Sequence, residues 1–261
     1  MHILLFFLTL LSTYWVGSAF LGGGGWYCFS LMTILLAHEL GHWLMSRRHR
    51  VKASLPYFIP FPLPPFGTLG AVIRMRSPMT TRKALLDIGA AGPFAGLVFA
   101  LPAVVVGLSY SSVVEKMPTE GLPLGSSLLF HILVRWVKGP IPGGQEVLLH
   151  PLAYAGWVGL FVTALNLLPI GQLDGGHILY SLIGERSIKA FKLALGVFGL
   201  VCIVFYPGWF LLILLLLLFG LRHPPPLDPV TPLGKGRVVV GLLAFLIFFL
   251  CFTPVPFQIW G

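Results

Sequence analysis

The chain has 261 residues, of which 57% are hydrophobic and 10% are charged, and its mean hydropathy is +0.92. These values exclude an ordinary soluble globular domain and predict an integral membrane protein. The formal net charge is +9, but the basic residues form short clusters between apolar runs, as in membrane-protein loops. We therefore expect no nucleic-acid partner. Cys28, Cys202 and Cys251 show no paired spacing and indicate buried apolar positions.

The first two apolar runs predict membrane-spanning helices. Residues 3–21 have one feature of a secretory signal, the small-residue stretch Gly17-Ser18-Ala19. The segment before this run has no Lys or Arg, however, and the run is long enough to span a bilayer, which favours a retained first crossing. Residues 26–46 form the second expected crossing, and it ends at a basic cluster of Arg47, Arg48, Arg50 and Lys52.

The second crossing contains the sequence Ala-His-Glu-Leu-Gly-His-Trp at residues 37–43. Residues four apart share one face of a helix, so His38 and His42 can bind one metal ion while Glu39 lies beside it. This is the H-E-x-x-H pattern of zinc hydrolases, in which zinc activates a water molecule and a carboxylate takes its proton. Because ionisable side chains are unfavourable inside a membrane without a function, we expect two zinc ligands and a general base.

The segment after the second crossing is rich in proline and glycine. Residues 53–66 contain five prolines, which exclude an ordinary helix. They are either a plain loop or, as we favour, a re-entrant element sheltered by the helices. Residues 66–73 are short, partly β-branched and punctuated by glycine, which predicts a strand or tight hairpin.

Further apolar runs predict the remaining crossings. The third is expected at about 85–108, where Gly92 and Gly96 form a helix-packing G-x-x-x-G pair. Residues 109–150 are more polar, and 126–137 can form an amphipathic interfacial helix. The other predicted segments are a crossing at about 151–168, a two-crossing hairpin over 190–221 divided at Pro207-Gly208, and a last crossing at about 238–253.

These segments predict an all-α polytopic membrane protein with six to seven transmembrane helices and a short membrane-associated β-hairpin after the second helix. We expect one domain over 1–261, with a catalytic core at about 26–183 and C-terminal helices at about 189–253. In this layout 14 of the 17 Lys and Arg residues lie on the side where the second crossing ends, which places that side in the cytoplasm. A single kinked helix over 190–221 would place only 11 Lys and Arg residues on that side and 6 on the other, which is a weaker bias.

Three acids lie in or at the edge of the crossings: Glu39, Asp87 and Asp174. Glu39 is assigned as the base, and Asp87 lies near the start of a helix, where the exposed amide groups favour an acid for structural reasons. Asp174 remains as the third metal ligand, because the fourth crossing returns to the side on which His42 lies. His177 follows three residues later and is either a contact of the site or a helix-terminal side chain at the interface.

The paired motifs resemble those of a known family. The H-E-L-G-H sequence at 38–42, with N-x-x-P-x-x-x-x-D-G at 166–175, resembles the site-2 protease family of intramembrane zinc metalloproteases. The PYFIPFP and FGTLGAVI stretches resemble the loop and β-hairpin of its bacterial and plastid branch without a PDZ or CBS domain. The resemblance implies one Zn²⁺ per chain on His38, His42 and Asp174, Glu39 as general base, and Asn166 near the substrate or the oxyanion.

The expected function is hydrolysis of peptide bonds within or near transmembrane segments of membrane-anchored proteins. We expect Gly67, Thr68, Leu69 and Gly70 to offer a strand edge to the unwound substrate. The expected location is a lipid bilayer, a bacterial inner or plasma membrane, with the active site toward the cytoplasm. The sequence indicates neither the substrate's identity nor the oligomeric state.

Two other functions compete with this one. A membrane metalloprotease of a different kind would use a Glu on a later helix as its third ligand, and the sequence has no later intramembrane Glu. A non-catalytic metal-binding scaffold or transporter could use the same side chains. Transporters often contain paired halves, and we find no internal repeat.

Overall fold

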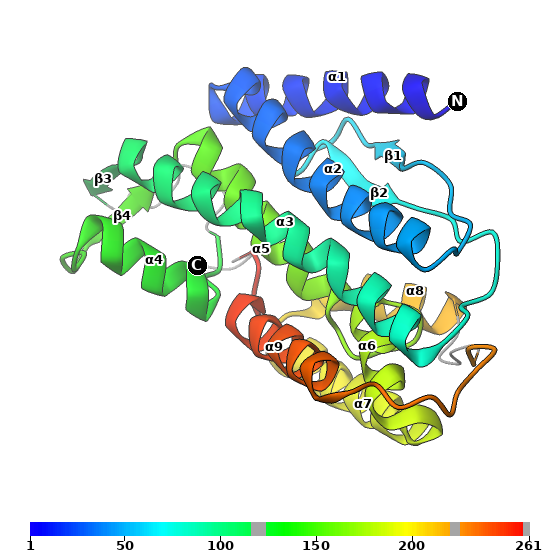
Figure 1. Cartoon of the computed structure of the whole chain (residues 1–261). Helices are drawn as coiled ribbons and strands as arrows, with labels where there is room; N and C mark the ends of the chain where they lie inside the picture. Colours follow the sequence, from blue (N-terminus) through cyan, green and yellow to red (C-terminus); the bar gives the residue numbers. More distant parts are fainter. Residues whose placement is uncertain (116–123, 220–224, 258–261) are drawn as a thin grey trace.

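The protein is described by a computed structural model, which covers residues 1–115, 124–219 and 225–257. Most of this part is helical, with two small hairpins (Figure 1). The helices are α1 (His2–Leu21), α2 (Gly24–Arg48), α3 (Arg82–Tyr110), α4 (Leu128–Lys138), α5 (Pro151–Asn166), α6 (Asp174–Ile183), α7 (Ser187–Val204), α8 (Phe210–Phe219) and α9 (Lys235–Cys251). The strands are β1 (Tyr57–Pro60), β2 (Thr68–Val72), β3 (Ser112–Glu115) and β4 (Gln145–Leu148), and 3-10 turns occupy Gly184–Arg186 and Pro207–Trp209.

Four helical stretches of the described chain are long and apolar enough to cross a membrane. They are His2–Leu21, Gly24–Arg48, Arg82–Tyr110 and Asp174–Val204. Helix α5 is apolar but has only 16 residues. The prediction of a helical, multi-pass membrane protein is therefore confirmed, whereas the predicted number of six to seven crossings is not.

Helices α2, α3 and α5 form the centre of the structure, with α1 outside α2, and with α6 and α9 against α3 (Figure 1). Their packing faces are rich in small side chains, which allow close approach of the helix backbones. Large residues fill the remaining space, among them the fully buried Trp157 of α5 and Tyr27 of α2. The two histidines of the H-E-x-x-H motif therefore lie in the central helix layer.

Strands β1 and β2 form an antiparallel hairpin, which confirms the predicted hairpin after the second helix. Its register pairs Phe58 with Ala71 and Pro60 with Thr68, with an irregularity between Phe58 and Pro60. The proline-rich segment thus contributes a strand, which the sequence analysis did not predict. Proline lacks a backbone N–H, so a strand tolerates it at a position where no N–H is needed for pairing with the neighbouring strand. The Tyr27 hydroxyl donates to the Phe66 carbonyl oxygen at 2.7 Å and so ties the hairpin to α2.

The polar region between α3 and α5 contains one predicted and one unpredicted element. Helix α4 confirms the amphipathic helix expected at 126–137, and the Ser127 side chain caps it by accepting from the Phe130 amide. Strands β3 and β4 pair in antiparallel register from Ser112↔Leu148 to Glu115↔Gln145. Neither strand was predicted, because four-residue strands give too short a pattern to recognise.

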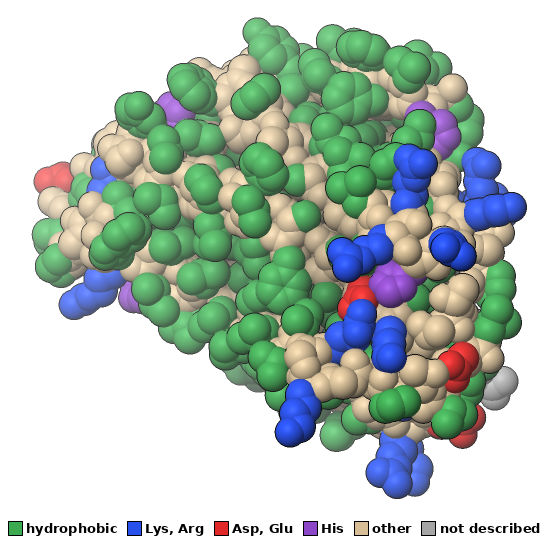
Figure 2. Space-filling view, in the orientation of Figure 1, with side chains coloured by type: hydrophobic (Ala, Val, Ile, Leu, Met, Phe, Trp, Pro, Cys, Tyr) green, Lys and Arg blue, Asp and Glu red, His purple; other side chains and the backbone are tan. Residues whose placement is uncertain are grey.

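The expected division of residues 190–221 is confirmed for its described part. Helix α7 ends at Val204, a 3-10 turn covers Pro207–Trp209, and α8 starts at Phe210. Lys and Arg side chains gather over the end of the molecule where α2 ends and α3 begins, whereas hydrophobic side chains dominate the rest of this face (Figure 2). This grouping agrees with the predicted basic side. Arg222, which we assigned to that side, lies outside the described residues.

Candidate metal centre

Helix α2 holds two imidazole rings on its buried face. His38 and His42 are 4% and 6% exposed, and their Nε2 atoms are 3.1 Å apart. The spacing of four residues sets the rings on successive turns of one face, as expected from the sequence. Two nitrogen atoms of this kind approach one point in an apolar interior, where they need a proton or a cation between them.

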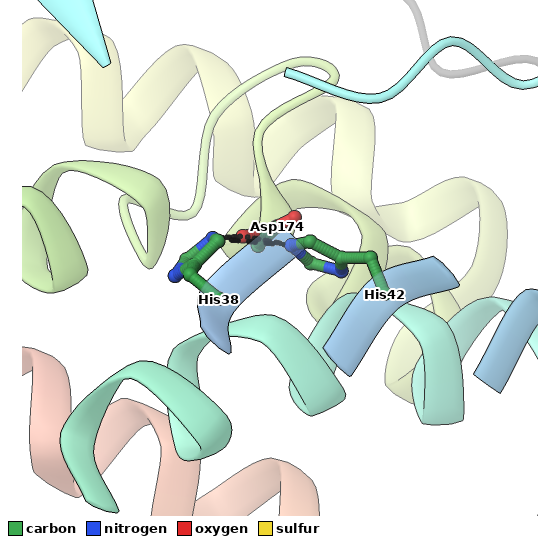
Figure 3. A group of neighbouring side chains, drawn as sticks. All are labelled: His38, His42 and Asp174. Atoms are coloured by element: carbon green, nitrogen blue, oxygen red, sulfur yellow. Dashed lines mark hydrogen bonds and ion pairs between the residues drawn. The ribbon is translucent and has the colours of Figure 1, made fainter. Parts of the chain in front are cut away.

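Asp174 completes the group from a distant part of the chain. Helix α5 ends at Asn166, and the following loop turns through Gly171, whose φ of 57° suits glycine. Helix α6 then starts at Asp174. The Asp174 Oδ2 atom lies 3.3 Å from His38 Nε2 and 3.2 Å from His42 Nε2, and the two rings converge on it (Figure 3). The structure thus brings together the three side chains that the sequence predicted as metal ligands.

The three side chains fit a zinc ion. A tetrahedral zinc about 2.0–2.1 Å from its ligands holds the ligand atoms about 3.3–3.4 Å apart. The separations here are 3.1, 3.2 and 3.3 Å. Two imidazoles and a carboxylate leave a fourth tetrahedral position for water, which is the arrangement of catalytic zinc sites.

Helix α3 orients one of the ligands. His42 Nδ1 lies 2.7 Å from the Ile88 carbonyl oxygen. A carbonyl can only accept, so Nδ1 carries the hydrogen and Nε2 is left with a lone pair directed at the site. Such contacts fix the tautomer and ring orientation of metal-binding histidines.

Glu39 lies next to the metal ligands on α2 and is 6% exposed. Its carboxyl group interacts electrostatically with His42, Asp174 and the Ile73 backbone amide. Ile73 directly follows β2. The β1–β2 hairpin therefore reaches the predicted general base, a connection that the sequence analysis did not contain.

Asn166 lies at the same site. Its Nδ2 atom is 3.3 Å from His38 Nε2, and it is the last residue of α5. The carboxamide therefore lies beside the predicted metal ligands, and its contact with substrate or an oxyanion stays a prediction.

The sequence analysis missed the role of the α3 glycines beyond helix packing. A Cβ atom on Gly92 would lie 2.1 Å from His42 Nε2, and one on Gly96 would lie 3.4 Å from His38 Cβ. The sequence did contain a signal for this contact, because the two glycines have the same spacing of four residues as the two histidines. In antiparallel helices this spacing places Gly92 opposite His42 and Gly96 opposite His38. Gly92 thus keeps open the space that the metal-binding ring occupies.

The other candidates have different surroundings. His177 lies in the first turn of α6, where its Cβ would be 3.1 Å from a Cβ on Gly89, and its function stays a prediction. Gly67 has a φ of 78°, and its carbonyl accepts from Ser12 of α1 at 2.6 Å. Thr68 begins β2, and Leu69 and Gly70 continue it.

Asp87 has a structural environment, as expected, but the reason differs from the one we gave. Its carboxylate binds Arg237 of α9 through two parallel hydrogen bonds of 2.9 and 2.8 Å. It also accepts from His49 Nε2 at 2.8 Å. The acid therefore joins α2, α3 and α9 rather than serving the start of α3 alone.

Comparison with known proteins assigns the chain to a family. The model of peptidase family M50 matches residues 26–206. The probable zinc metalloprotease EGY1, chloroplastic, of Arabidopsis thaliana is 33% identical over 237 residues, which cover 87% of this chain and 42% of that protein. EGY1 of Oryza sativa subsp. japonica is 36% identical over 183 residues, covering 66% and 31%. The probable zinc metalloprotease EGY2, chloroplastic, of Arabidopsis thaliana is 27% identical over 237 residues, covering 87% and 41%.

No solved structure matches the chain significantly. The chain spans less than half the length of these three relatives. All three are named as chloroplast proteins, so the expected bacterial inner or plasma membrane is not supported. With the family model covering more than half of the sequence, and with both predicted motifs meeting at one buried site, this chain belongs to peptidase family M50, the site-2 protease family.

Proposed function

We propose that the chain is an intramembrane zinc metalloprotease that hydrolyses peptide bonds within or beside transmembrane segments of membrane-anchored proteins. The observation that carries this proposal is the convergence of His38, His42 and Asp174 beside Glu39. The zinc metalloprotease names of the relatives support it. His38, His42 and Asp174 would hold one Zn²⁺, which supplies a Lewis acid and lowers the pKa of a bound water molecule.

Residues of the chain would supply proton transfer, oxyanion stabilisation and the exclusion of bulk water. Glu39 accepts a proton from the attacking water and passes it to the leaving amine. The Asn166 carboxamide donates a hydrogen bond to the oxyanion that develops on the substrate carbonyl. Burial of Glu39 and of both histidines excludes bulk water, which strengthens these electrostatic interactions.

The β1–β2 hairpin would hold the substrate. A helical substrate satisfies its backbone groups internally, so cleavage requires local unwinding and new partners for the exposed N–H and C=O groups. The Phe61 amide donates to the Gly67 carbonyl oxygen, which makes Pro60 and Thr68 a non-hydrogen-bonded pair. The Thr68 amide therefore faces away from β1, toward the outer edge of β2, where an extended substrate can add as a further strand.

The topology is part of the proposal. The four longest apolar stretches already include α7; α5 and α9 bring the count to six crossings, and α8 brings it to the seven that the sequence allows. One membrane domain over 1–261 would contain a catalytic core at about 26–183 and C-terminal helices at about 189–253. The basic end would face the cytoplasm or its topological equivalent.

Glu39→Gln tests the proposed reaction. The variant should keep one zinc per chain, since Glu39 is not a ligand, and should lose cleavage. Membrane-protein fragments released by cells that express the wild type or Glu39→Gln are compared by mass spectrometry, with Glu146→Gln in β4 as a matched control. Fragments that depend on Glu39 and not on Glu146 identify substrates. Equal fragment sets, with zinc bound in every variant, would favour a non-catalytic scaffold or transporter.

Thr68→Pro tests substrate capture by the strand. Proline removes the outward amide without removing a β1–β2 ladder bond, whereas Thr68→Val keeps the amide and loses only the hydroxyl contacts with Ile59 and Gly70. We expect cleavage to fall about tenfold more in the proline variant than in the valine variant, which corresponds to the loss of about one backbone hydrogen bond to the substrate. Equal activity of the two variants, with zinc retained, would reject strand capture.

A further inference from the structure

A pocket of about 330 Å³ lies between the β1–β2 hairpin, α5 and the α7–α8 junction. This volume is at the lower end of the range for small-ligand sites. Its walls are formed mainly by aromatic and aliphatic side chains, and neither the metal centre nor the proposed mechanism uses it. The principal lining residues are Phe66, Phe161, Leu165, Tyr206, Trp209 and Leu212.

The pocket walls are held in place by contacts with one another and with neighbouring segments. Phe161 stacks with both Phe66 and Trp209, with ring centroids 5.9 and 5.8 Å apart. Trp209 is 4% exposed, and its indole nitrogen donates to the Pro254 carbonyl oxygen at 2.7 Å. The carbonyl groups of Pro65 and Phe66 accept from Tyr154 and Tyr27. A pocket with fixed walls binds a side chain without first having to order itself.

Two walls of the pocket continue into the catalytic site. Leu165 directly precedes Asn166, which lies 3.3 Å from His38 Nε2. Phe66 lies two residues before β2, the strand that leads to Ile73 and its contact with Glu39. The pocket therefore borders both the proposed substrate strand and the helix end that carries Asn166.

We propose that this pocket is a specificity site for a large apolar or aromatic side chain of the substrate, about five residues from the scissile bond. The proposal rests on the proposed protease function. A peptide paired with β2 advances in register with it. Thr68, the first residue of β2, lies two residues after the pocket-lining Phe66 and five residues before Ile73, which interacts with Glu39. The mainly apolar walls leave a charged side chain largely without partners, so the pocket would reject it.

The first test uses the full chain in lipid nanodiscs and a transmembrane peptide that the wild type cleaves at one mapped bond. Phe, Leu, Ala or Asp is placed in turn at each of the positions three to seven residues from that bond, on either side. At one position, about five residues away, Phe should exceed Ala in kcat/KM by about tenfold or more. A profile that is flat at every position would overturn the proposal.

Filling the pocket should remove this preference. Leu212→Trp adds a large ring to the wall, whereas Leu217→Trp adds the same ring at an exposed position of α8 outside the pocket. We expect Leu212→Trp to reduce the Phe-to-Ala ratio of kcat/KM to about twofold or less, and Leu217→Trp to keep the wild-type ratio. A preference that survives in Leu212→Trp would overturn the proposal.

Binding separates this proposal from the protease function itself. The same peptide, carrying benzoylphenylalanine at each scanned position, is photo-cross-linked to the Glu39→Gln chain. Labelling of the segments that contain Phe66 or Trp209 would support the pocket even if no peptide were cleaved, in which case only the protease function would fail. Labelling by a phospholipid with a photoreactive acyl chain and not by any peptide would show a lipid-filled pocket and overturn the proposal.

Discussion

His42 Nδ1 lies 2.7 Å from the Ile88 carbonyl oxygen, which makes α3 part of the metal centre although it supplies no ligand. The contact holds the ring so that Nε2 faces His38 and Asp174. Because Ile88 contributes a backbone atom, this requirement is met by the position of α3 and not by a particular side chain. Changes that shift α3 relative to α2 should therefore affect the metal before they affect the rest of the fold.

Gly92→Ala should eliminate metal binding. The added Cβ would lie 2.1 Å from His42 Nε2, so the ring must leave its position. We expect zinc content, measured by mass spectrometry of the purified protein, to fall from about one ion per chain to near zero and cleavage to disappear with it. Gly199→Ala in α7, where a Cβ meets no atom within 4 Å, is the control and should bind zinc normally. Full zinc content in Gly92→Ala would contradict the close approach of α3.

Gly96→Ala should be much milder than Gly92→Ala. Its Cβ would make ordinary contacts of 3.4 Å with His38. We expect zinc to bind with an affinity within about tenfold of the wild type, measured by competition with a chelator. The critical result is that Gly92→Ala binds zinc much more weakly than Gly96→Ala. If the two glycines served only helix packing, both variants should have similar effects.

Asp87→Ala should destabilise the protein by about 1–3 kcal/mol, because Arg237 and His49 lose a hydrogen-bonded anionic partner. The measurement is thermal unfolding in detergent. Arg237 is 37% exposed, so solvent weakens its share of the interaction. Arg237→Lys keeps the charge but not the two parallel bonds and should lose only part of this stability. An unchanged unfolding temperature in Asp87→Ala would show that the three helices are held together without this contact.

Removal of zinc should lower the unfolding temperature of the wild type. A ligand at 100 times its Kd stabilises the native state by about 2.7 kcal/mol. A chelator should therefore shift the unfolding of the wild type and should have no effect on Asp174→Ala, which lacks a ligand. A chelator effect of equal size in both would place the stabilising metal elsewhere.

The catalytic pattern could be predicted from the sequence because it depends on local spacing. His38 and His42 share a helix face by geometry, and an isolated acid at the end of a later apolar run left Asp174 as their partner. The long helices were predictable for a similar reason, since a bilayer requires long apolar segments. The hairpin was expected after residue 66, whereas its β1 strand was not recognised because prolines lie directly before it and at its last position.

Contacts between distant segments could not be predicted. The approach of Gly92 to His42, of Ile73 to Glu39 and of Arg237 to Asp87 depends on how helices and hairpin pack, and no local pattern encodes these distances. Gly92 and Gly96 were interpreted as a helix-packing pair, and that interpretation was correct but incomplete. The sequence contained the matching spacing, yet only the packing showed which glycine faces which histidine.

Zinc X-ray absorption spectroscopy of the purified chain tests the central claim most directly. Two imidazole nitrogens, a carboxylate oxygen and a water oxygen at about 2.0–2.1 Å should surround the metal in the wild type. The zinc should be lost or loosely held in both His42→Ala and Asp174→Ala, because each variant lacks one of the three ligands. A metal that shows sulfur ligands, or that keeps an unchanged spectrum in Asp174→Ala, would contradict a site built from His38, His42 and Asp174.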